Sequence, residues 1–262
     1  MNSPHLFSFG GGVQSTAALV LAATGRIDYR SFVFANVGDD SENPGTLAYV
    51  RDVAIPYAES SGLELTTLQR KRRDGTIETL LERVERSKRS IPIPVRMSNG
   101  APGNRQCTFD FKIRPIAQEL KRRGATKDNP WTVGLGISVD EIHRARTNSG
   151  IAWELLAYPL LDLKLNRHDC LALIRDAGLP QPPKSSCWFC PFHDTRTWQE
   201  MRANQPGLFE KSAALEESIN EKRGRLGRDR VFFSGRCKPL REAIKETGQI
   251  EMEGCDSGYC FT

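Results

Sequence analysis

A run of three glycines between two apolar segments is the feature that most constrains this sequence. Residues 6–9 are strand-length and predict a buried strand, and residues 16–23 are strong helix formers that are apolar on nearly all sides, which predicts a buried helix. The glycines at positions 10–12 let the backbone approach a ligand closely. The first N–H groups of the helix attract an anion. The segment therefore predicts a phosphate-binding loop.

The rest of the chain predicts an α/β fold. Strand-like segments at 31–35, 63–68 and 131–137 alternate with helical ones, which favours a doubly wound, mainly parallel sheet. Pro56 predicts a kink or break in the helical segment 46–61. The composition of the sequence changes after Leu179, where prolines and then cysteines follow. We therefore expect a nucleotide-binding domain at 1–179 and a smaller, cysteine-rich, mostly helical region at 180–262.

Composition narrows the function classes. The chain has 262 residues, of which 39% are hydrophobic, so it can bury a core, and its apolar runs are shorter than the roughly 20 residues that span a bilayer. Residues 1–5 lack the basic start of a signal peptide, which predicts a cytoplasmic protein without a membrane partner. The net charge is +5, and the basic runs at 70–73 and 222–230 fit either polyanion contact or a solvated face.

Two common nucleotide motifs do not match the glycine loop. A Walker A loop needs a lysine, and the first lysine of the chain is Lys71. A dinucleotide fingerprint needs a glycine where Ser15 stands and an acidic residue closing the second strand, where Asn36 stands. The nucleotide-binding candidates that remain in the loop are Ser8, Gly10, Gly11, Gly12, Gln14, Ser15 and Thr16.

Residues 8–16 resemble the pyrophosphate loop (PP-loop) of the ATP pyrophosphatase superfamily. That resemblance implies an adenine nucleotide α-hydrolase-like fold, binding of ATP with Mg²⁺, and cleavage of ATP between the α and β phosphates. The sequence departs from the family pattern at two positions, because Gly10 replaces its leading serine and Gln14 replaces its aspartate.

The resemblance continues beyond the loop. Residues 34–39, 105–115 and 134–144 are similar to segments of adenylylsulfate and phosphoadenylylsulfate (PAPS) reductases, and most of all to the reductase-like proteins of bacteria and phages, including the sulfur-inserting subunit of DNA phosphorothioation systems. The likeness covers roughly residues 6 to 260. It implies that Asn36 and Arg144 add to the nucleotide site and that Asp140 takes part in catalysis.

Seven cysteines suggest metal or redox chemistry in a reducing compartment. Cys187 and Cys190 form a Cys-x-x-Cys pair followed by proline, a pattern of iron–sulfur loops. The resemblance adds Cys107, although Thr108 replaces the second cysteine of the reductase pair. We expect Cys237 as the fourth ligand of a 4Fe–4S cluster.

The other cysteines leave alternatives open. Cys255 or Cys260 could replace Cys237 as a ligand, and a Zn²⁺ site or metal-free redox dithiols remain alternatives to the cluster. Cys255 and Cys260 lie in a glycine-containing tail, and we predict that they carry electrons or sulfur to the nucleotide site. Cys170 lies in an apolar helical pattern and is expected in the core.

Taken together, the sequence predicts an enzyme that couples ATP to sulfur transfer. The expected ligand is ATP or an adenylylated nucleotide, the acceptor is a nucleic acid or a nucleotide, and the partner is a sulfur or electron donor protein. One alternative is a sulfonucleotide reductase. Another is an accessory protein that binds nucleic acid, is regulated by ATP and holds a structural zinc. The oligomeric state is left open.

Overall fold

The structure is a computed structural model that describes residues 4–87 and 90–245. The chain forms two compact units. Unit 1 comprises Met1–Glu78 and Asp110–Ser186, and unit 2 comprises Thr79–Phe109 and Cys187–Thr262. The chain therefore enters unit 2 twice, whereas the regions expected from sequence, 1–179 and 180–262, are contiguous.

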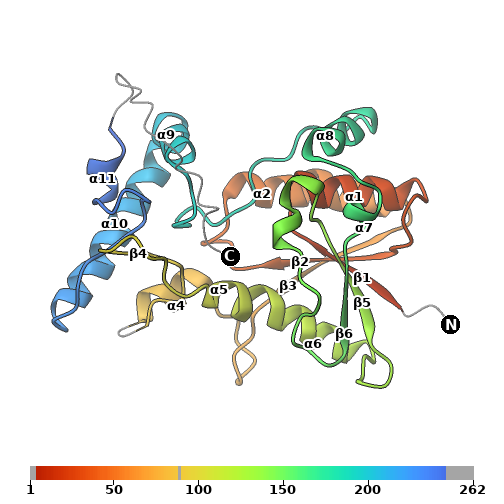
Figure 1. Cartoon of the computed structure of the whole chain (residues 1–262), viewed down its shortest axis with the longest axis horizontal. Coiled ribbons are helices and arrows are strands. Elements are labelled where there is room, and N and C mark those ends of the chain that lie inside the picture. The colour runs from red at the N-terminus through yellow and green to blue at the C-terminus, as the bar shows by residue number, and fades with distance from the viewer. Residues whose placement is uncertain (1–3, 88–89, 246–262) are drawn as a thin grey trace. The chain divides into compact units, whose positions relative to one another are not determined.

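Unit 1 is built on a five-stranded parallel sheet (Figure 1). Its strands are β1 (His5–Phe9), β2 (Ser31–Asn36), β3 (Glu64–Gln69), β5 (Trp131–Leu135) and β6 (Glu154–Ala157), in the order β3-β2-β1-β5-β6. The order reverses direction between β1 and β5, which is where open α/β sheets bind ligands at the carboxyl ends of their strands. The predicted α/β class is confirmed, and the sheet is consistent with an adenine nucleotide α-hydrolase-like fold.

Helices cover both faces of this sheet. Figure 1 shows α1 (Val13–Ala23), α7 (Pro159–Asp162) and α8 (Arg167–Asp176) on one face and α6 (Arg114–Arg122) on the other. Successive strand residues alternate between the two cores, because side chains of a strand point to opposite faces. Phe7 and Phe32 join the core under α1, while Leu6 and Val33 join the core under α6.

The predicted interruption at Pro56 is confirmed. Helix α2 (Pro44–Tyr49) passes through a π-helical segment (Val50–Ala54) into α3 (Ile55–Ser60). Proline has no N–H to donate and its ring displaces the preceding turn, so the helical bonds shift their spacing there.

Unit 2 is mostly helical, as predicted for the C-terminal region. Its elements are α4 (Leu80–Arg86), β4 (Arg96–Met97), α5 (Gln106–Thr108), α9 (Thr195–Asn204), α10 (Pro206–Gly224), β7 (Val231–Phe232) and α11 (Leu240–Ala243). Strands β4 and β7 pair antiparallel. Large aromatic side chains form the buried core, among them Trp188, Phe189, Trp198, Phe209 and Phe233.

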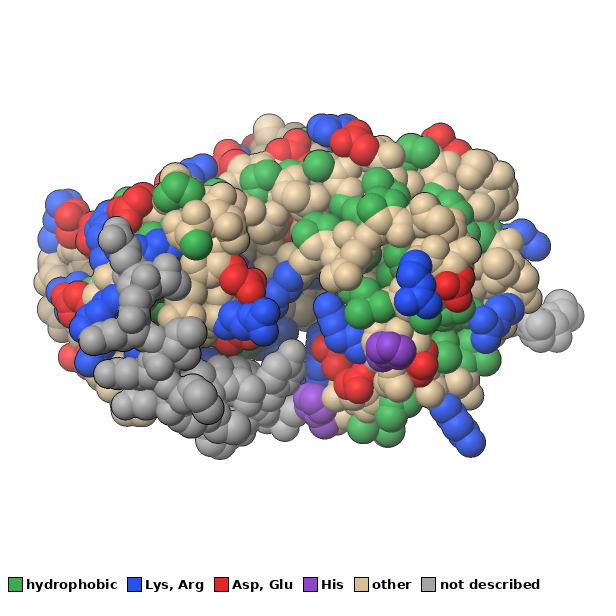
Figure 2. All heavy atoms as spheres, turned by 90° about the horizontal axis from the view of Figure 1, so that it is seen from above, with side chains coloured by type: hydrophobic (Ala, Val, Ile, Leu, Met, Phe, Trp, Pro, Cys, Tyr) green, Lys and Arg blue, Asp and Glu red, His purple; other side chains and the backbone are tan. Residues whose placement is uncertain are grey.

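The surface carries mixed charge. On the face shown in Figure 2, Lys and Arg side chains are interspersed with Asp and Glu side chains. Within residues 4–87 and 90–245, every helix is too short or too polar to cross a bilayer.

Candidate functional site

The phosphate loop joins β1 to α1 in unit 1, and its shape depends on glycine. Gly11 has φ 75°, in the left-handed region that favours glycine. A Cβ atom at Gly11 would also lie 2.8 Å from Cγ2 of Thr46, too close for any side chain. Gly12 is the N-cap of α1, where its N–H donates to Ser15 Oγ (3.1 Å) and its carbonyl accepts from the same hydroxyl (3.0 Å). The predicted strand–glycine–helix element is therefore present.

Two segments distant in sequence line this loop. A Cβ atom at Gly136, just after β5, would lie 3.1 Å from the backbone nitrogen of Ser15. The hydroxyl of Ser185 donates to the carbonyl of Gly10. Sequence reasoning missed Ser185, because one serine in a serine- and proline-containing loop gives no signal until the fold places it.

Buried oxygen atoms without partners mark the segment beside the loop. Both carboxylate oxygens of Glu42 and the hydroxyl of Thr46 are buried and have no hydrogen-bond partner among the described residues. Both residues are 0% exposed, and Thr46 is the neighbour of Gly11. Buried polar groups are normally satisfied by protein, water or ions. Sequence reasoning also missed Glu42, because its burial is a tertiary effect.

Gln14 connects the loop to the segment that follows β5. Its side-chain nitrogen lies 3.5 Å from Ser138 Oγ and 3.4 Å from Glu141 Oε2, and its oxygen lies 3.5 Å from Arg167 Nη1. These bonds are long, so they are easily exchanged for bonds to a ligand. The carboxylate of Glu141 thus lies beside the side chain of Gln14.

Two predicted residues occupy the 3-10 helix Val139–Arg144. Asp140 is exposed and its carboxylate accepts from the first N–H of α8, that of Arg167, at 2.5 Å and from the Ser138 hydroxyl at 3.3 Å. Arg144 has a side chain that is 48% exposed and pairs with Glu141 at 2.6 Å. The structure thus places both near Gln14, while their catalytic and ATP-binding roles stay predictions.

The remaining predicted nucleotide ligands lie on or beside the strands and α1. Asn36 ends β2, where its oxygen accepts from the Gly38 N–H (2.8 Å) and its amide donates to Asp39 (2.7 Å), so its side chain shapes the turn. Ser8 is partly buried within β1, and Ser15 and Thr16 are 5% and 0% exposed.

Four predicted cysteine ligands share unit 2 and are partly exposed: Cys107, Cys187, Cys190 and Cys237. Cys187 and Cys190 bracket a turn closed by a 3.1 Å bond between their backbones. The two residues between them anchor the turn, since Trp188 is 2% exposed and Phe189 is 0% exposed. Trp198, in the following helix α9, is also buried, with 1% of its surface exposed.

Cys237 lies in a strained loop. Its φ of 52° is in the left-handed region, which costs about 1 kcal/mol or more for a residue with a side chain. Its thiol donates to the Met97 carbonyl at 3.5 Å. The carboxylate of buried Glu216 accepts from the N–H groups of Phe233 (2.6 Å) and Leu240 (2.9 Å) and so fixes both ends of the loop. Burial raises the pKa of Glu216.

The donor atoms of unit 2 suit iron–sulfur or zinc chemistry, because thiolates are the preferred ligands of both. Across residues 4–87 and 90–245, however, no three cysteine, histidine or acidic side chains converge on one metal-sized position. Cys255 and Cys260 lie outside the described residues. The ligand set therefore stays a prediction.

Cys170 differs from these cysteines. It is 0% exposed in the core of unit 1, and burial, with smaller contributions from Asp169 and Asp140, raises the pKa of its thiol to about 11. Its predicted core position is confirmed.

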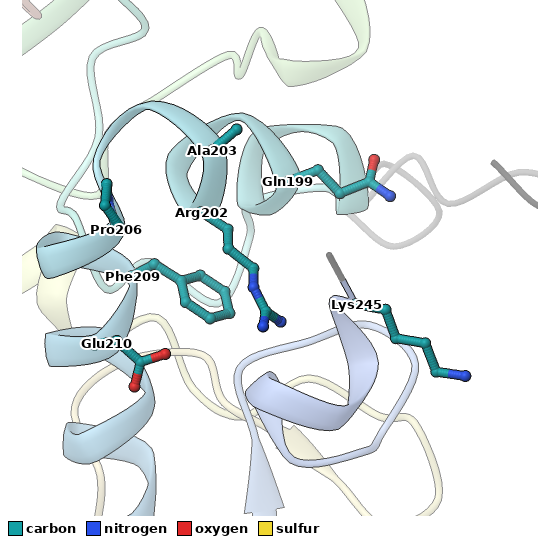
Figure 3. A pocket seen from close by; sticks show the side chains of 7 residues that line it. All are labelled: Gln199, Arg202, Ala203, Pro206, Phe209, Glu210 and Lys245. Carbon is teal, nitrogen blue, oxygen red and sulfur yellow. The ribbon is translucent and has the colours of Figure 1, made fainter. Parts of the chain in front are cut away.

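Unit 2 also contains a surface cavity of about 420 Å³ (Figure 3). It is lined by α9, α10 and the chain just after α11, and Arg202 covers the ring of Phe209 at 5.1 Å. None of the predicted site residues lines it, so it lies apart from the predicted chemistry.

Comparisons with known proteins leave this chain without an assigned family. No family model matches the sequence, and no curated protein matches it. Among solved structures, the chain is similar to the U34-tRNA thiolase NcsA from Methanococcus maripaludis with its [4Fe-4S] cluster. The identity is 16%, the match covers 83% of this chain and 72% of that chain, and the TM-score is 0.43. At that TM-score the likeness is no basis for an activity, so function must be argued from this chain's own residues.

Proposed function

We propose that this protein binds ATP with Mg²⁺ at the phosphate loop and couples it to sulfur transfer to a nucleic acid or a nucleotide. The observation that carries the proposal is the loop itself. Gly11 has a left-handed φ and no room for a side chain beside Thr46, so this loop conformation depends on glycine. The N–H groups that begin α1 would hold the phosphates, as helix N-termini do in other nucleotide sites.

The residues beside the loop supply the other groups that ATP needs. Mg²⁺ prefers carboxylate and hydroxyl oxygens, and Glu42 and Thr46 offer such oxygens in buried, unpartnered form. Gln14 and Arg144 would contact the phosphates, and Asp140 would accept a proton from the acceptor. The resemblance to the PP-loop superfamily favours attack at the α phosphate, which releases pyrophosphate and leaves AMP on the acceptor.

The thiols of unit 2 would serve the second half of the reaction. Cys107, Cys187, Cys190 and Cys237 would hold a 4Fe–4S cluster, which supplies a site for binding sulfur. Cys255 and Cys260 would receive sulfur or electrons from a donor protein. Hydrosulfide would then displace AMP from the acceptor, with the acceptor oxygen leaving on AMP and no change of oxidation state. Sulfur carried as a persulfide would be transferred with formation of a Cys255–Cys260 disulfide, which two electrons from the donor protein would reduce.

Product analysis under anaerobic conditions tests this proposal. The protein is incubated with ATP, Mg²⁺, sulfide and a panel of nucleic acids and nucleotides. AMP and pyrophosphate, formed in proportion to sulfur-containing acceptor and lost in Gly11→Ala, would support it. Sulfite formation from adenylylsulfate without ATP would instead identify a sulfonucleotide reductase.

A different result would identify the accessory protein. ATP binding without AMP formation on any acceptor, together with one zinc per chain, would leave the nucleotide site a regulatory role.

A further inference from the structure

In unit 2, the guanidinium groups of two arginines contact the same aromatic ring. The guanidinium carbon of Arg96 lies 5.5 Å from the ring centroid of Phe192, and that of Arg105 lies 5.1 Å from the same centroid. Both distances are within the range of cation–π attraction. Arg96, Arg105 and Phe192 are called here the arginine–phenylalanine site.

Among the residues that the structure describes, no carboxylate pairs with the two arginines of this site. Within the described ranges, neither arginine has a side-chain hydrogen bond, and Nε of Arg96 is buried without an acceptor. The basic run at 70–73 shows the contrast, because the side chain of Arg70 is 15% exposed and pairs with Glu78 at 2.6 Å. Two like charges beside one ring, with a buried donor unused, indicate that an anion belongs there.

The site also adjoins three of the four predicted cysteine ligands, Cys107, Cys190 and Cys237, in sequence or through a neighbouring residue. Arg105 precedes Cys107 by two residues, and Phe192 follows Cys190 by two residues. Arg96 precedes Met97, whose carbonyl accepts from the thiol of Cys237. An anion bound by these arginines would therefore lie beside the thiols of the same unit.

We propose that the arginine–phenylalanine site binds a phosphodiester of single-stranded nucleic acid and thereby presents the acceptor strand to the cysteines. A guanidinium offers a planar pair of donors that matches phosphate, and stacking on a ring holds that plane in place. Single strands suit the site because their bases are accessible to chemistry, whereas bases in a duplex are stacked away. The role as acceptor site rests on the proposed function, but the binding itself does not.

The surroundings favour a strand over a free nucleotide. Arg230 is exposed immediately before β7, whereas Arg225 pairs with Glu221 at 4.0 Å. Strand β7 pairs with β4 so that Phe232 lies opposite Arg96. Arg230 therefore adds a further cation beside the small sheet, and a polymer carries further phosphates that such a cation can contact.

Binding of a labelled 15-nucleotide single strand, measured by anisotropy without ATP, tests the proposal. The variant Arg105→Gln changes an exposed side chain, so we expect it to fold normally. The double variant, Arg96→Gln with Arg105→Gln, removes both charges of the site. Arg196→Gln is the matched control, since it removes one charge from α9 of the same unit. We expect the removal of each site arginine to weaken strand binding by about fivefold or more. It should also reduce the slope of log affinity against log salt concentration by about one. The control variant should bind as the wild type does.

The outcomes separate this proposal from the proposed function. Unchanged strand binding in the double variant would overturn it. If Arg105→Gln weakened binding only as much as Arg196→Gln does, the proposal would also be overturned, because binding would then depend on net charge and not on this site. Inorganic phosphate or AMP competing as well as the strand would overturn the choice of a polymer. A wild-type protein that binds the strand through these arginines but neither binds ATP nor holds iron would keep this inference and reject the proposed function.

Discussion

The phosphate loop of unit 1 and the cysteine loops of unit 2 are formed in opposite ways. The phosphate loop is set by backbone conformation: Gly11 has a left-handed φ, Gly12 caps α1, and Ser185 holds the Gly10 carbonyl. The cysteine loops are set by anchors beside the thiols, such as Trp188 next to Cys187. A site made of backbone is complete without its ligand, whereas a site made of thiolates is completed by the metal that draws them together.

The largest expected effect tests whether the cysteine loops of unit 2 bind a metal cluster. Cys187→Ser removes one thiolate from the anchored turn, and we expect the iron content to fall tenfold or more, because a cluster with a missing ligand is readily lost. Iron and sulfide analysis of anaerobically purified protein measures it.

Cys170→Ala is the control for that variant. It removes a buried thiol of unit 1 that has no predicted ligand role. It should keep the full iron content and lower the free energy of unfolding by roughly 1–2 kcal/mol. Equal iron loss in both variants would show that stability, and not ligation, determines metal content.

The next effect would break the backbone side. Gly11→Ala places a Cβ atom 2.8 Å from Thr46 Cγ2 at a φ of 75°. We expect a loss of about 2–4 kcal/mol in the free energy of unfolding, with ATP binding weakened at least tenfold. Urea titration and calorimetric ATP titration measure the two quantities.

Gly207→Ala is the matched substitution for Gly11→Ala. No side chain or distant backbone atom lies within 4 Å of its added Cβ. ATP binding should therefore stay the same, and the free energy of unfolding should stay the same or rise by up to about 1 kcal/mol, because Gly207 lies in α10 and alanine favours a helix. If Gly11→Ala behaves like this control, the loop is not a constrained cradle.

A smaller effect is expected in the pH dependence of the free energy of unfolding. Burial raises the pKa of Glu154 on β6 from 4.5 to about 7, so the folded state holds this proton more tightly than the unfolded state. Stability should therefore fall as pH rises from about 4.5 to about 7. Glu154→Gln should remove roughly 1 kcal/mol of that fall, allowing for partial exposure.

Urea midpoints at pH 5 and pH 8 measure the effect, with Glu59→Gln on the exposed face of α3 as control. A pH dependence that is the same in the wild type and in Glu154→Gln would contradict the assignment.

The smallest effect on stability is expected at Arg144. Its ion pair with Glu141 is half-exposed, so Arg144→Gln should change the free energy of unfolding by about 0.5 kcal/mol or less. If the residue contacts ATP, affinity falls several-fold while stability holds. Unchanged affinity would remove Arg144 from the nucleotide site.

Local sequence signals predicted the parts of the fold that depend on neighbours in the chain. The glycines at 10–12 lie between an apolar strand and an apolar helix, so the phosphate loop could be predicted from local sequence alone. Asparagine is a favoured helix N-cap, and Asn166 begins α8 in this way, where its side chain accepts from the Asp169 N–H at 3.0 Å. Pro56 predicted the interruption before α3 for the same local reason.

Features set by distant segments were not predictable in this way. Strands β4 and β7 have two residues each, too short to show a periodic pattern. Glu42 and Ser185 gain their importance from burial and from contact with residues far along the chain. The stack of Arg96 and Arg105 on Phe192 joins β4, the start of α5 and the loop after Cys190, so no spacing rule connects them.

The most direct test of the central claim is the visible spectrum of anaerobically purified protein, with iron, sulfide and zinc measured on the same sample. The account predicts about four irons and four sulfides per chain, with a broad absorption band that arises from thiolate-ligated iron. A colourless protein that holds one zinc and no iron would contradict it, and would leave the protein with a structural metal site in unit 2 and an ATP-binding sheet in unit 1.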